Sequence, residues 1–235
     1  MKRTILATII AATTLTATTA MARDDIKVTV TNLTNGIYFT PLLVAAHDRN
    51  THLFELGKAA SSHLQAMAEG GDISGLAADL ASNNGTVVTN PANGLLAPGA
   101  STTAMLDIQD RHNRNLSVVA MMLPTNDGFI GLNAIAIPRH RGVYTFYLNG
   151  YDAGTEANDE IINGGGAPGV PGIPADPGGH GGTGATGAAM ADSNTTVHIH
   201  PGNIGDMDPA GGFSDLDSRV HRWLNPVARV VLTVK

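Results

Sequence analysis

Residues 116–132 read Leu-Ser-Val-Val-Ala-Met-Met-Leu-Pro-Thr-Asn-Asp-Gly-Phe-Ile-Gly-Leu, and this stretch decides the fold class. Its first eight residues are nearly all apolar, which is typical of a central strand buried on both faces. Turn-forming residues follow at 125–128, and a second apolar run begins at Phe129. Two strands joined by a tight polar turn are therefore predicted here.

Further strand-like runs lie on both sides of this hairpin. Residues 26–32 alternate apolar with polar side chains, and a longer run covers residues 37–47. Pro41 cannot donate to a sheet ladder, so the second strand is expected at an edge or with a bulge. Other strands are predicted at 86–89, 102–108, 129–137, 142–148 and 228–234. Short strands at this spacing predict a mainly β fold, an antiparallel β-sandwich of about eight strands.

Residues 53–82 have a different periodicity. Leu, Met and Ala recur every three or four residues from Leu53 to Ala68, and Gly70-Gly71 ends that run. A second, shorter run begins near Ser74 and continues to Leu80. The spacing predicts one or two short helices that pack on the core.

Residues 163–191 are dominated by glycine and proline, with prolines at 168, 171, 174 and 177. Such a composition offers little apolar area to offset the entropy lost on ordering. We therefore expect a long, flexible surface insertion within a single domain that covers residues 23–235.

The N-terminus resembles a secretory signal peptide. Lys2 and Arg3 precede a short apolar stretch, and Ala20-Met21-Ala22 forms a small-x-small cleavage site. The apolar stretch is too short and too rich in Thr to span a bilayer well. We expect residues 1–22 to be removed after Ala22 and the mature protein to be secreted or periplasmic, without a transmembrane segment.

Composition excludes several classes of function. Removal of Lys2 and Arg3 would leave 12 basic residues against 20 acidic ones, a net charge of −8, and no basic stripe is present. A nucleic-acid partner is therefore not expected. The absence of cysteine excludes disulfides, thiolate metal sites and a cysteine nucleophile.

Three carboxylates are the strongest candidates for a site: Asp127, Asp152 and Glu156. Asp127 precedes the predicted strand 129–137, and the pair Asp152 and Glu156 follows the predicted strand 142–148. Loops fixed by a rigid sheet are where binding residues concentrate. Carboxylates are also the ligands that Ca²⁺ prefers. Asp and Gly are common turn formers too, so either group taken alone also fits ordinary turn chemistry. Together the three acids predict a site for one Ca²⁺ ion.

A competing hypothesis uses histidines. His198 and His200 share one face of a predicted strand, and a third ligand such as His180 or His221 would complete a transition-metal site. This alternative describes a transition-metal-binding protein or a metal-dependent hydrolase. A pair of hydrogen-bonded strand histidines explains the same spacing without a metal.

Two other motifs support no separate function. Residues 182–187 have dinucleotide-type glycine spacing, but no strand precedes them. Residues 206–217 resemble a calcium loop, although Ala210 occupies the fifth position and no helix is predicted before it. Neither a serine-hydrolase nucleophile elbow nor a zinc-protease histidine motif occurs, so we expect no enzyme activity.

Four segments, in this order, resemble the spondin domain of F-spondin and mindin, and its bacterial exported versions in particular. They are Tyr-Phe-Thr-Pro-Leu-Leu-Val-Ala-Ala-His at 38–47, Thr-Asn-Asp-Gly-Phe-Ile-Gly-Leu at 125–132, Asp-Ala-Gly-Thr-Glu at 152–156 and Asn-Pro-Val-Ala-Arg-Val at 225–230. The resemblance implies an antiparallel sandwich with a layout similar to C2 domains and one Ca²⁺ ion at a sandwich end. The family's three acids fall on Asp127, Asp152 and Glu156, where Glu156 replaces the usual Asp.

The resemblance also implies a role. Animal spondin domains belong to matrix and adhesion proteins, which favours a structural or adhesive module that is not an enzyme. The partner would be an unidentified protein or surface, and self-association is a further possibility. The disulfides of the animal domains are missing here.

Overall fold

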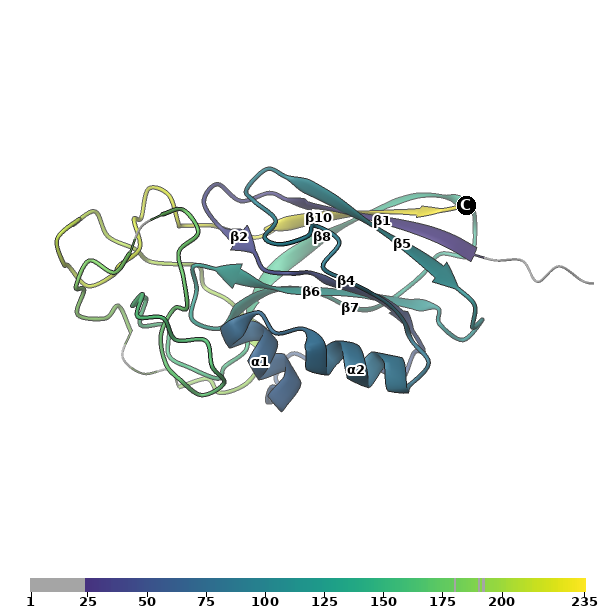
Figure 1. Cartoon of the computed structure of the whole chain (residues 1–235), viewed down its shortest axis with the longest axis horizontal. Helices are drawn as coiled ribbons and strands as arrows, with labels where there is room; N and C mark the ends of the chain where they lie inside the picture. The colour runs from purple at the N-terminus through teal and green to yellow at the C-terminus, as the bar shows by residue number, and fades with distance from the viewer. Residues whose placement is uncertain (1–23, 180, 190, 192) are drawn as a thin grey trace, which may run out of the picture.

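The computed structural model describes residues 24–235 apart from 180, 190 and 192, and it contains ten strands and two short helices in this part of the chain (Figure 1). The expected signal peptide lies outside the described residues. The strands are β1 (Asp24–Asn32), β2 (Tyr38–Phe39), β3 (Leu43–His47), β4 (Thr86–Thr89), β5 (Ser101–Ile108), β6 (Asn115–Leu123), β7 (Gly128–Ala136), β8 (Gly142–Asp152), β9 (His198–Ile199) and β10 (Ala228–Val234). The helices are α1 (Ser62–Gly70) and α2 (Ser74–Ser82).

The strands form one antiparallel sheet in the order β4-β3-β6-β7-β8-β10-β1-β5, with β2 beside β6 and β9 beside β8. β8 belongs to two layers, because residues 142–148 pair with β10 and residues 149–152 pair with β7. The sheet therefore curls until its two halves face each other (Figure 1). The predicted antiparallel sandwich is confirmed, with β8 shared between layers so that the sheet is nearly closed.

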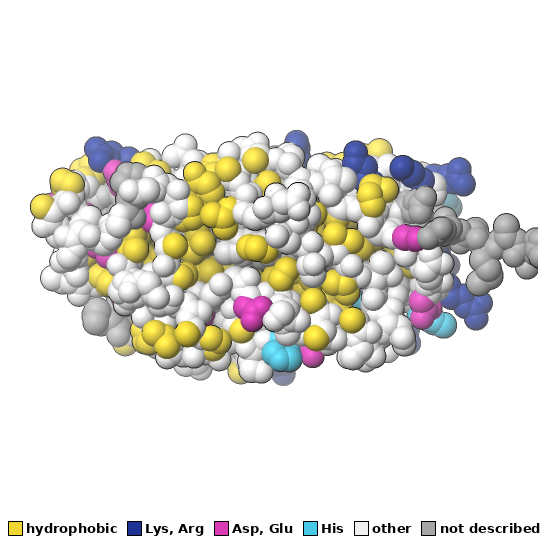
Figure 2. All heavy atoms as spheres, viewed as in Figure 1, with side chains coloured by type: hydrophobic (Ala, Val, Ile, Leu, Met, Phe, Trp, Pro, Cys, Tyr) yellow, Lys and Arg dark blue, Asp and Glu magenta, His cyan; other side chains and the backbone are white. Residues whose placement is uncertain are grey.

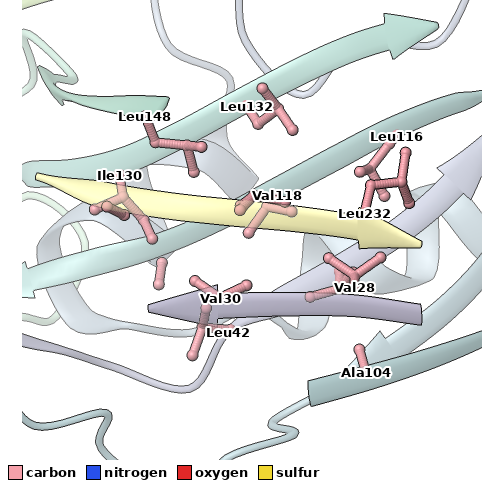
Figure 3. Packing of buried hydrophobic residues seen from close by; sticks show 14 of the residues in the cluster. Val28, Val30, Leu42, Ala104, Leu116, Val118, Ile130, Leu132, Leu148 and Leu232 are labelled. Atoms are coloured by element: carbon pink, nitrogen blue, oxygen red, sulfur yellow. The ribbon is translucent and has the colours of Figure 1, made fainter. Parts of the chain in front are cut away.

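Alternating side chains from the two layers fill the space between them. Val28 and Leu232 project from one layer toward Val118 and Ile130 of the other, and all four are at most 1% exposed (Figure 3). Each such side chain contributes roughly 1.5 to 3 kcal/mol when fully buried. This core fixes the register of the strands, because a one-residue slip would turn every apolar side chain outward.

The second face of β6 is covered by α1. Val119 and Met121 point away from the main core and join a second apolar cluster with Leu64 of α1. Ser61 begins the helix by accepting a hydrogen bond from the Leu64 N–H at 3.1 Å, and Gly71 ends it with a φ of 73°. β6 is thus buried on both faces, as its continuous apolar sequence predicts.

The helical spacing predicts the wrong start for the first helix. Helix α1 begins at Ser62, whereas the spacing predicts helix from Leu53. Leu53 and Phe54 are buried outside any helix, and the Phe54 ring centroid lies 5.1 Å from that of Phe129. Aromatic packing and the hydrogen bond from the Leu53 N–H to Asn133 Oδ1 therefore override the helical spacing.

The expectation for Pro41 is half right. The run 37–47 breaks at Pro41 into β2 and β3, because proline has no N–H to continue the ladder. However, β3 lies between β4 and β6, so it is not an edge strand.

Residues 163–191 contain no helix or named strand among the described positions. The structure adds contacts that composition did not predict. Ile173 is fully buried and pairs with Ile162 in an isolated bridge. The insertion and residues 200–227 form the loop-rich end of the molecule, opposite the C-terminus (Figure 1).

Neither described helix has the length and apolar character needed to cross a membrane.

Candidate metal centre

Asp127 is placed by the tight turn between β6 and β7. The Gly128 N–H donates to Thr125 Oγ1 at 3.0 Å, and the Thr125 hydroxyl in turn donates to the Met122 carbonyl. A Cβ on Gly128 would lie 2.6 Å from Thr125 Oγ1, so the closeness of this turn requires glycine. The turn holds Asp127 at the loop-rich end with no exposed surface.

Strand pairing brings Asp152 to the same place. Gly128 at the start of β7 pairs with Asp152 at the end of β8, and the Ala153 N–H donates to the Asp127 carbonyl at 3.3 Å. Asp152 is also fully buried. Two acids that are 25 positions apart in the sequence therefore lie together at one end of the sandwich.

The two oxygens of the Asp127 carboxylate differ. Oδ2 accepts hydrogen bonds from the Thr155 N–H at 2.8 Å, the Thr155 hydroxyl at 3.1 Å and the Glu156 N–H at 3.3 Å. Oδ1 is buried and has no hydrogen-bond partner among the described residues. A buried carboxylate oxygen without a partner is costly, and a bound cation would compensate it.

Asp152 is oriented by its own loop. Oδ1 accepts from the Gly154 N–H at 2.8 Å, and Oδ2 accepts from Asn158 Nδ2 at 2.7 Å. Gly154 has a φ of 69°, and a Cβ there would lie 2.6 Å from the Thr196 nitrogen. The glycine of the Asp-Ala-Gly-Thr-Glu segment is thus required for the loop to turn back on the Asp152 carboxylate.

Electrostatics make this pair unfavourable without a cation. Burial raises the pKa of Asp127, and the nearby Asp152 raises it further, while the Thr155 and Glu156 hydrogen bonds act in the opposite direction. The net result is a pKa of about 7. Ionised Asp127 is therefore unfavourable in the buried site and would be favoured by a positive charge placed beside it.

Glu156 approaches the pair through its backbone, but its side chain turns away. Oε2 accepts from the Gly172 N–H at 2.8 Å and from Asn126 Nδ2 at 3.3 Å, whereas Oε1 is buried and has no partner in the described segments. Burial first, and then the nearby Glu69 and Asp159, raise the pKa of Glu156 to about 7. The carboxylate of Glu156 thus faces a second group of acids.

In this arrangement, the described residues contain no group of three or more acids and histidines placed to hold a metal ion. The donor set still fits a hard cation, because Asp127 Oδ1 and Glu156 Oε1 are both buried carboxylate oxygens without partners. Asp127 and Asp152 would supply two of the ligands. Glu156 would join them only after its side chain rotates.

The histidines of the competing hypothesis have separate surroundings. His198 Nε2 lies 3.7 Å from Asp152 Oδ2, the His200 ring lies 5.0 Å from that of Trp223, and His221 Nε2 lies 3.7 Å from Asp176 Oδ2. His180 is outside the described residues. The described structure therefore brings His198 to the acidic pair but does not gather His198, His200 and His221 around one point.

In the calcium-loop-like segment 206–217, the acidic side chains bond to nearby residues of the same loop. The Asp206 carboxylate accepts hydrogen bonds from the N–H groups of Asp208, Phe213 and Ser214. The Asp217 carboxylate forms an ion pair with Arg219. These acids therefore stabilise the loop, and this role explains their spacing in the sequence.

The sequence did not predict several of the contacts around the candidate site. Asn126 and Thr155 lie inside the quoted motifs, so their role could have been suspected from position. Glu69, which is buried at the end of α1, gave no signal, because a glutamate before Gly70-Gly71 reads as an exposed helix end. The small areas of Asp and Glu at the loop-rich end of the face in Figure 2 accord with the burial of these acids.

The fold and the site define a mainly β domain with a buried acidic pair at the loop-rich end. The sequence model of the Spondin_N family matches residues 31–160, more than half of the chain. This chain therefore belongs to the Spondin_N family, and the resemblance seen in the sequence is confirmed. No curated protein matches the chain significantly.

Proposed function

We propose that this chain is an exported, non-enzymatic module that binds one Ca²⁺ ion through Asp127, Asp152 and Glu156. Its role would be structural or adhesive, toward a protein or surface partner or a second copy of itself. The signal-like N-terminus, the acidic composition and the Spondin_N match support export and this type of role.

One observation carries the proposal. Asp127 and Asp152 are both fully buried at adjoining strand ends, and within the part of the chain that the structure describes Asp127 Oδ1 has no hydrogen-bond partner. Burial of two neighbouring carboxylates is unfavourable unless a positive charge compensates them. Hard carboxylate oxygens favour Ca²⁺ over softer metals.

The residues of the site would then act in distinct ways. Asp127 and Asp152 would hold the ion, while the Thr155, Glu156 and Gly154 N–H groups keep both carboxylates in position. The bound charge would tie the β6–β7 turn to the loop after β8. The module would gain rigidity at the end of the sandwich where its partner-binding loops are expected.

His198 favours a second candidate, a transition-metal protein or metal-dependent hydrolase. Its Nδ1 lies 2.8 Å from the Thr196 carbonyl, so Nδ1 carries the proton and Nε2 faces Asp152. A backbone carbonyl that fixes the tautomer in this way is common for metal-binding histidines. In this candidate, Asp152 and His198 would share a softer ion such as Zn²⁺.

Calcium titration followed by thermal unfolding and calorimetry tests the first candidate. Saturation at about 100 times Kd should stabilise the protein by about 2.7 kcal/mol, and chelation should reverse the effect. Asp152→Ala should lose this response. Asp208→Ala is the matched control, because Asp208 is an exposed loop acid whose carboxylate accepts the Ala210 N–H.

The same titration separates the candidates. A response to Zn²⁺ or Cu²⁺ that His198→Gln removes, together with no response to Ca²⁺, would replace the first proposal with the second. A Ca²⁺ response that persists in His198→Gln supports the first.

A further inference from the structure

Residues 164–172, here called the strap, form a closed loop beside the acidic site. At its base, the Ile173 N–H donates to the Ile161 carbonyl at 2.8 Å, and Ile162 pairs with Ile173. Ile173 is fully buried, so the base of the strap is anchored in the body of the domain. The tip lies on the end of α1, where a Cβ on Gly70 would come within 2.1 Å of the Gly166 carbonyl oxygen.

Two carboxylates hold the strap against the body. Glu69 Oε2 accepts the Gly169 N–H at 2.6 Å, and Glu156 Oε2 accepts the Gly172 N–H at 2.8 Å. Charge-assisted hydrogen bonds of this kind are stronger than neutral ones. A segment rich in glycine is therefore held at two points by buried or half-buried acids.

Glu156 has two incompatible tasks. Its backbone N–H donates to Asp127 Oδ2 at 3.3 Å, which places the residue beside the acidic pair, while its carboxylate reaches the strap. A cation between Asp127 and Asp152 would attract this third carboxylate. The rotation that brings it there removes the acceptor of the Gly172 N–H.

Asn126 would stay in place during this rotation. Besides Glu156, its Nδ2 donates to Asp159 Oδ1 at 2.8 Å, and its Oδ1 accepts the Glu160 N–H at 3.1 Å. The Glu156 side chain can therefore leave without loss of the contacts that hold the β6–β7 turn.

We propose that Glu156 makes docking of the strap and ligation of the cation mutually exclusive. Binding of Ca²⁺ frees the Gly172 end of the strap, and a docked strap lowers the affinity for Ca²⁺ by the same factor. This inference rests on the proposed function. The strap follows the matched range 31–160, so the coupling is a property of this chain beyond the family match.

Amide hydrogen exchange followed by NMR, on the full protein with and without saturating Ca²⁺, tests the coupling. The Gly172 amide should exchange about tenfold faster or more when Ca²⁺ is bound, because it loses a hydrogen bond to a charged acceptor. Gly169 is the internal control, since its acceptor Glu69 is not a proposed ligand, and its exchange should change by less than about twofold. Unchanged or slower exchange at Gly172 would overturn the coupling.

Two variants sharpen this test. Gln at position 156 can still accept the Gly172 N–H but is a poorer cation ligand, so Glu156→Gln should abolish the response of Gly172 to Ca²⁺. Gly172 has a φ of 116°, a conformation that residues with a Cβ rarely adopt, so Gly172→Ala should undock the strap. Undocking should tighten Ca²⁺ binding by about threefold or more, through the reciprocity of coupled sites. An unchanged or weaker affinity would contradict the inference.

A calorimetric titration on the same samples separates the two possible failures. Absence of Ca²⁺ binding overturns the proposed function and the coupling together. Binding with an unaltered strap overturns the coupling alone.

Discussion

Two groups of buried carboxylates lie at the loop-rich end, and they differ in how their oxygens are satisfied. Asp215 accepts four hydrogen bonds, from the Ile162, Thr183 and Ala185 N–H groups and the Thr183 hydroxyl. Although burial acts to raise the pKa of Asp215, these hydrogen bonds lower it overall. In Asp127, burial and Asp152 prevail and raise the pKa to about 7.

This difference in hydrogen bonding distinguishes acids that stabilise loops from acids that could bind a cation. Glu160 belongs with Asp215, since its carboxylate accepts the Ile204 and Gly205 N–H groups and the Ser214 hydroxyl. Such fully bonded acids join the loop segments around residues 160–162, 183–185 and 204–215 to one another. In the described structure, Asp127 and Glu156 each keep one buried oxygen without a hydrogen-bond partner, and a cation can bind at such an oxygen.

The largest expected effect comes from Asp127→Asn. This change should weaken Ca²⁺ binding by at least about 100-fold, because it removes a charged ligand. It should also stabilise the Ca²⁺-free protein near pH 8, since it removes a carboxylate that burial and Asp152 disfavour. Calorimetry and urea unfolding measure the two effects. If the Ca²⁺-free variant were instead less stable, Asp127 would stabilise the fold as Asp215 does, and the two groups of acids would not differ in role.

Asp215→Ala should have the opposite effects on the two measured quantities, lowering folding stability while leaving the affinity for Ca²⁺ almost unchanged. It leaves the N–H groups of Ile162, Thr183 and Ala185 without their acceptor, so the free energy of unfolding should fall by about 2 to 3 kcal/mol. The affinity for Ca²⁺ should stay within about twofold of the original, because Asp215 is no ligand in this account. Urea unfolding and calorimetry check both, and a large loss of Ca²⁺ affinity would show that the groups are not independent.

The pH dependence of stability tests the raised pKa values. The pKa of Asp127 is about 7 in the folded protein against an ordinary value of 3.8. Between about pH 4 and 7 the unfolded chain therefore releases this proton while the folded protein retains it, so stability of the Ca²⁺-free protein falls as pH rises. The expected fall is a few kcal/mol, because each unit of difference between the folded and unfolded pKa corresponds to about 1.4 kcal/mol.

Saturating Ca²⁺ should oppose that fall, because the ion favours the ionised carboxylates. The increase in melting temperature on adding Ca²⁺ should therefore be larger at pH 7.5 than at pH 5. An increase that is equal at both pH values would contradict a site built on Asp127 and Glu156.

Glu156→Gln should produce the smallest change. We expect about a tenfold loss of Ca²⁺ affinity, or about 1.4 kcal/mol, because Asp127 and Asp152 remain. At pH 5 folding stability should be almost unaltered, because the pKa of Glu156 is raised to about 7, so the side chain is already neutral there, and glutamine can still accept the Gly172 N–H. A loss as large as that of Asp127→Asn would mean that the three acids contribute equally.

Local patterns predicted most of the fold. β4 and β10 have the predicted bounds, and β6 was recognised as a buried strand because apolar residues occupy both of its faces. The start of α1 and the position of β3 were not predicted correctly. Both depend on distant partners, namely the aromatic contacts of Phe54 and the pairing of β3 with β4 and β6.

The candidate site was predictable only in part. The resemblance and the turn motifs pointed to Asp127 and Asp152, and strand pairing brings them together. The direction of the Glu156 side chain depends on Gly172 in the insertion and on the distant Glu69, neither of which has a local signature. Composition described residues 163–191 as a flexible insertion, but it could not show that backbone N–H groups of this segment meet buried acids.

A crystal structure of the Ca²⁺-loaded protein would show most directly whether Asp127 and Asp152 bind the ion. We predict one ion within about 2.3 to 2.6 Å of Asp127 Oδ1 and of a carboxylate oxygen of Asp152, with the Glu156 side chain turned away from Gly172. An ion held instead by the loop 206–217, or no ion at saturating Ca²⁺, would contradict the account.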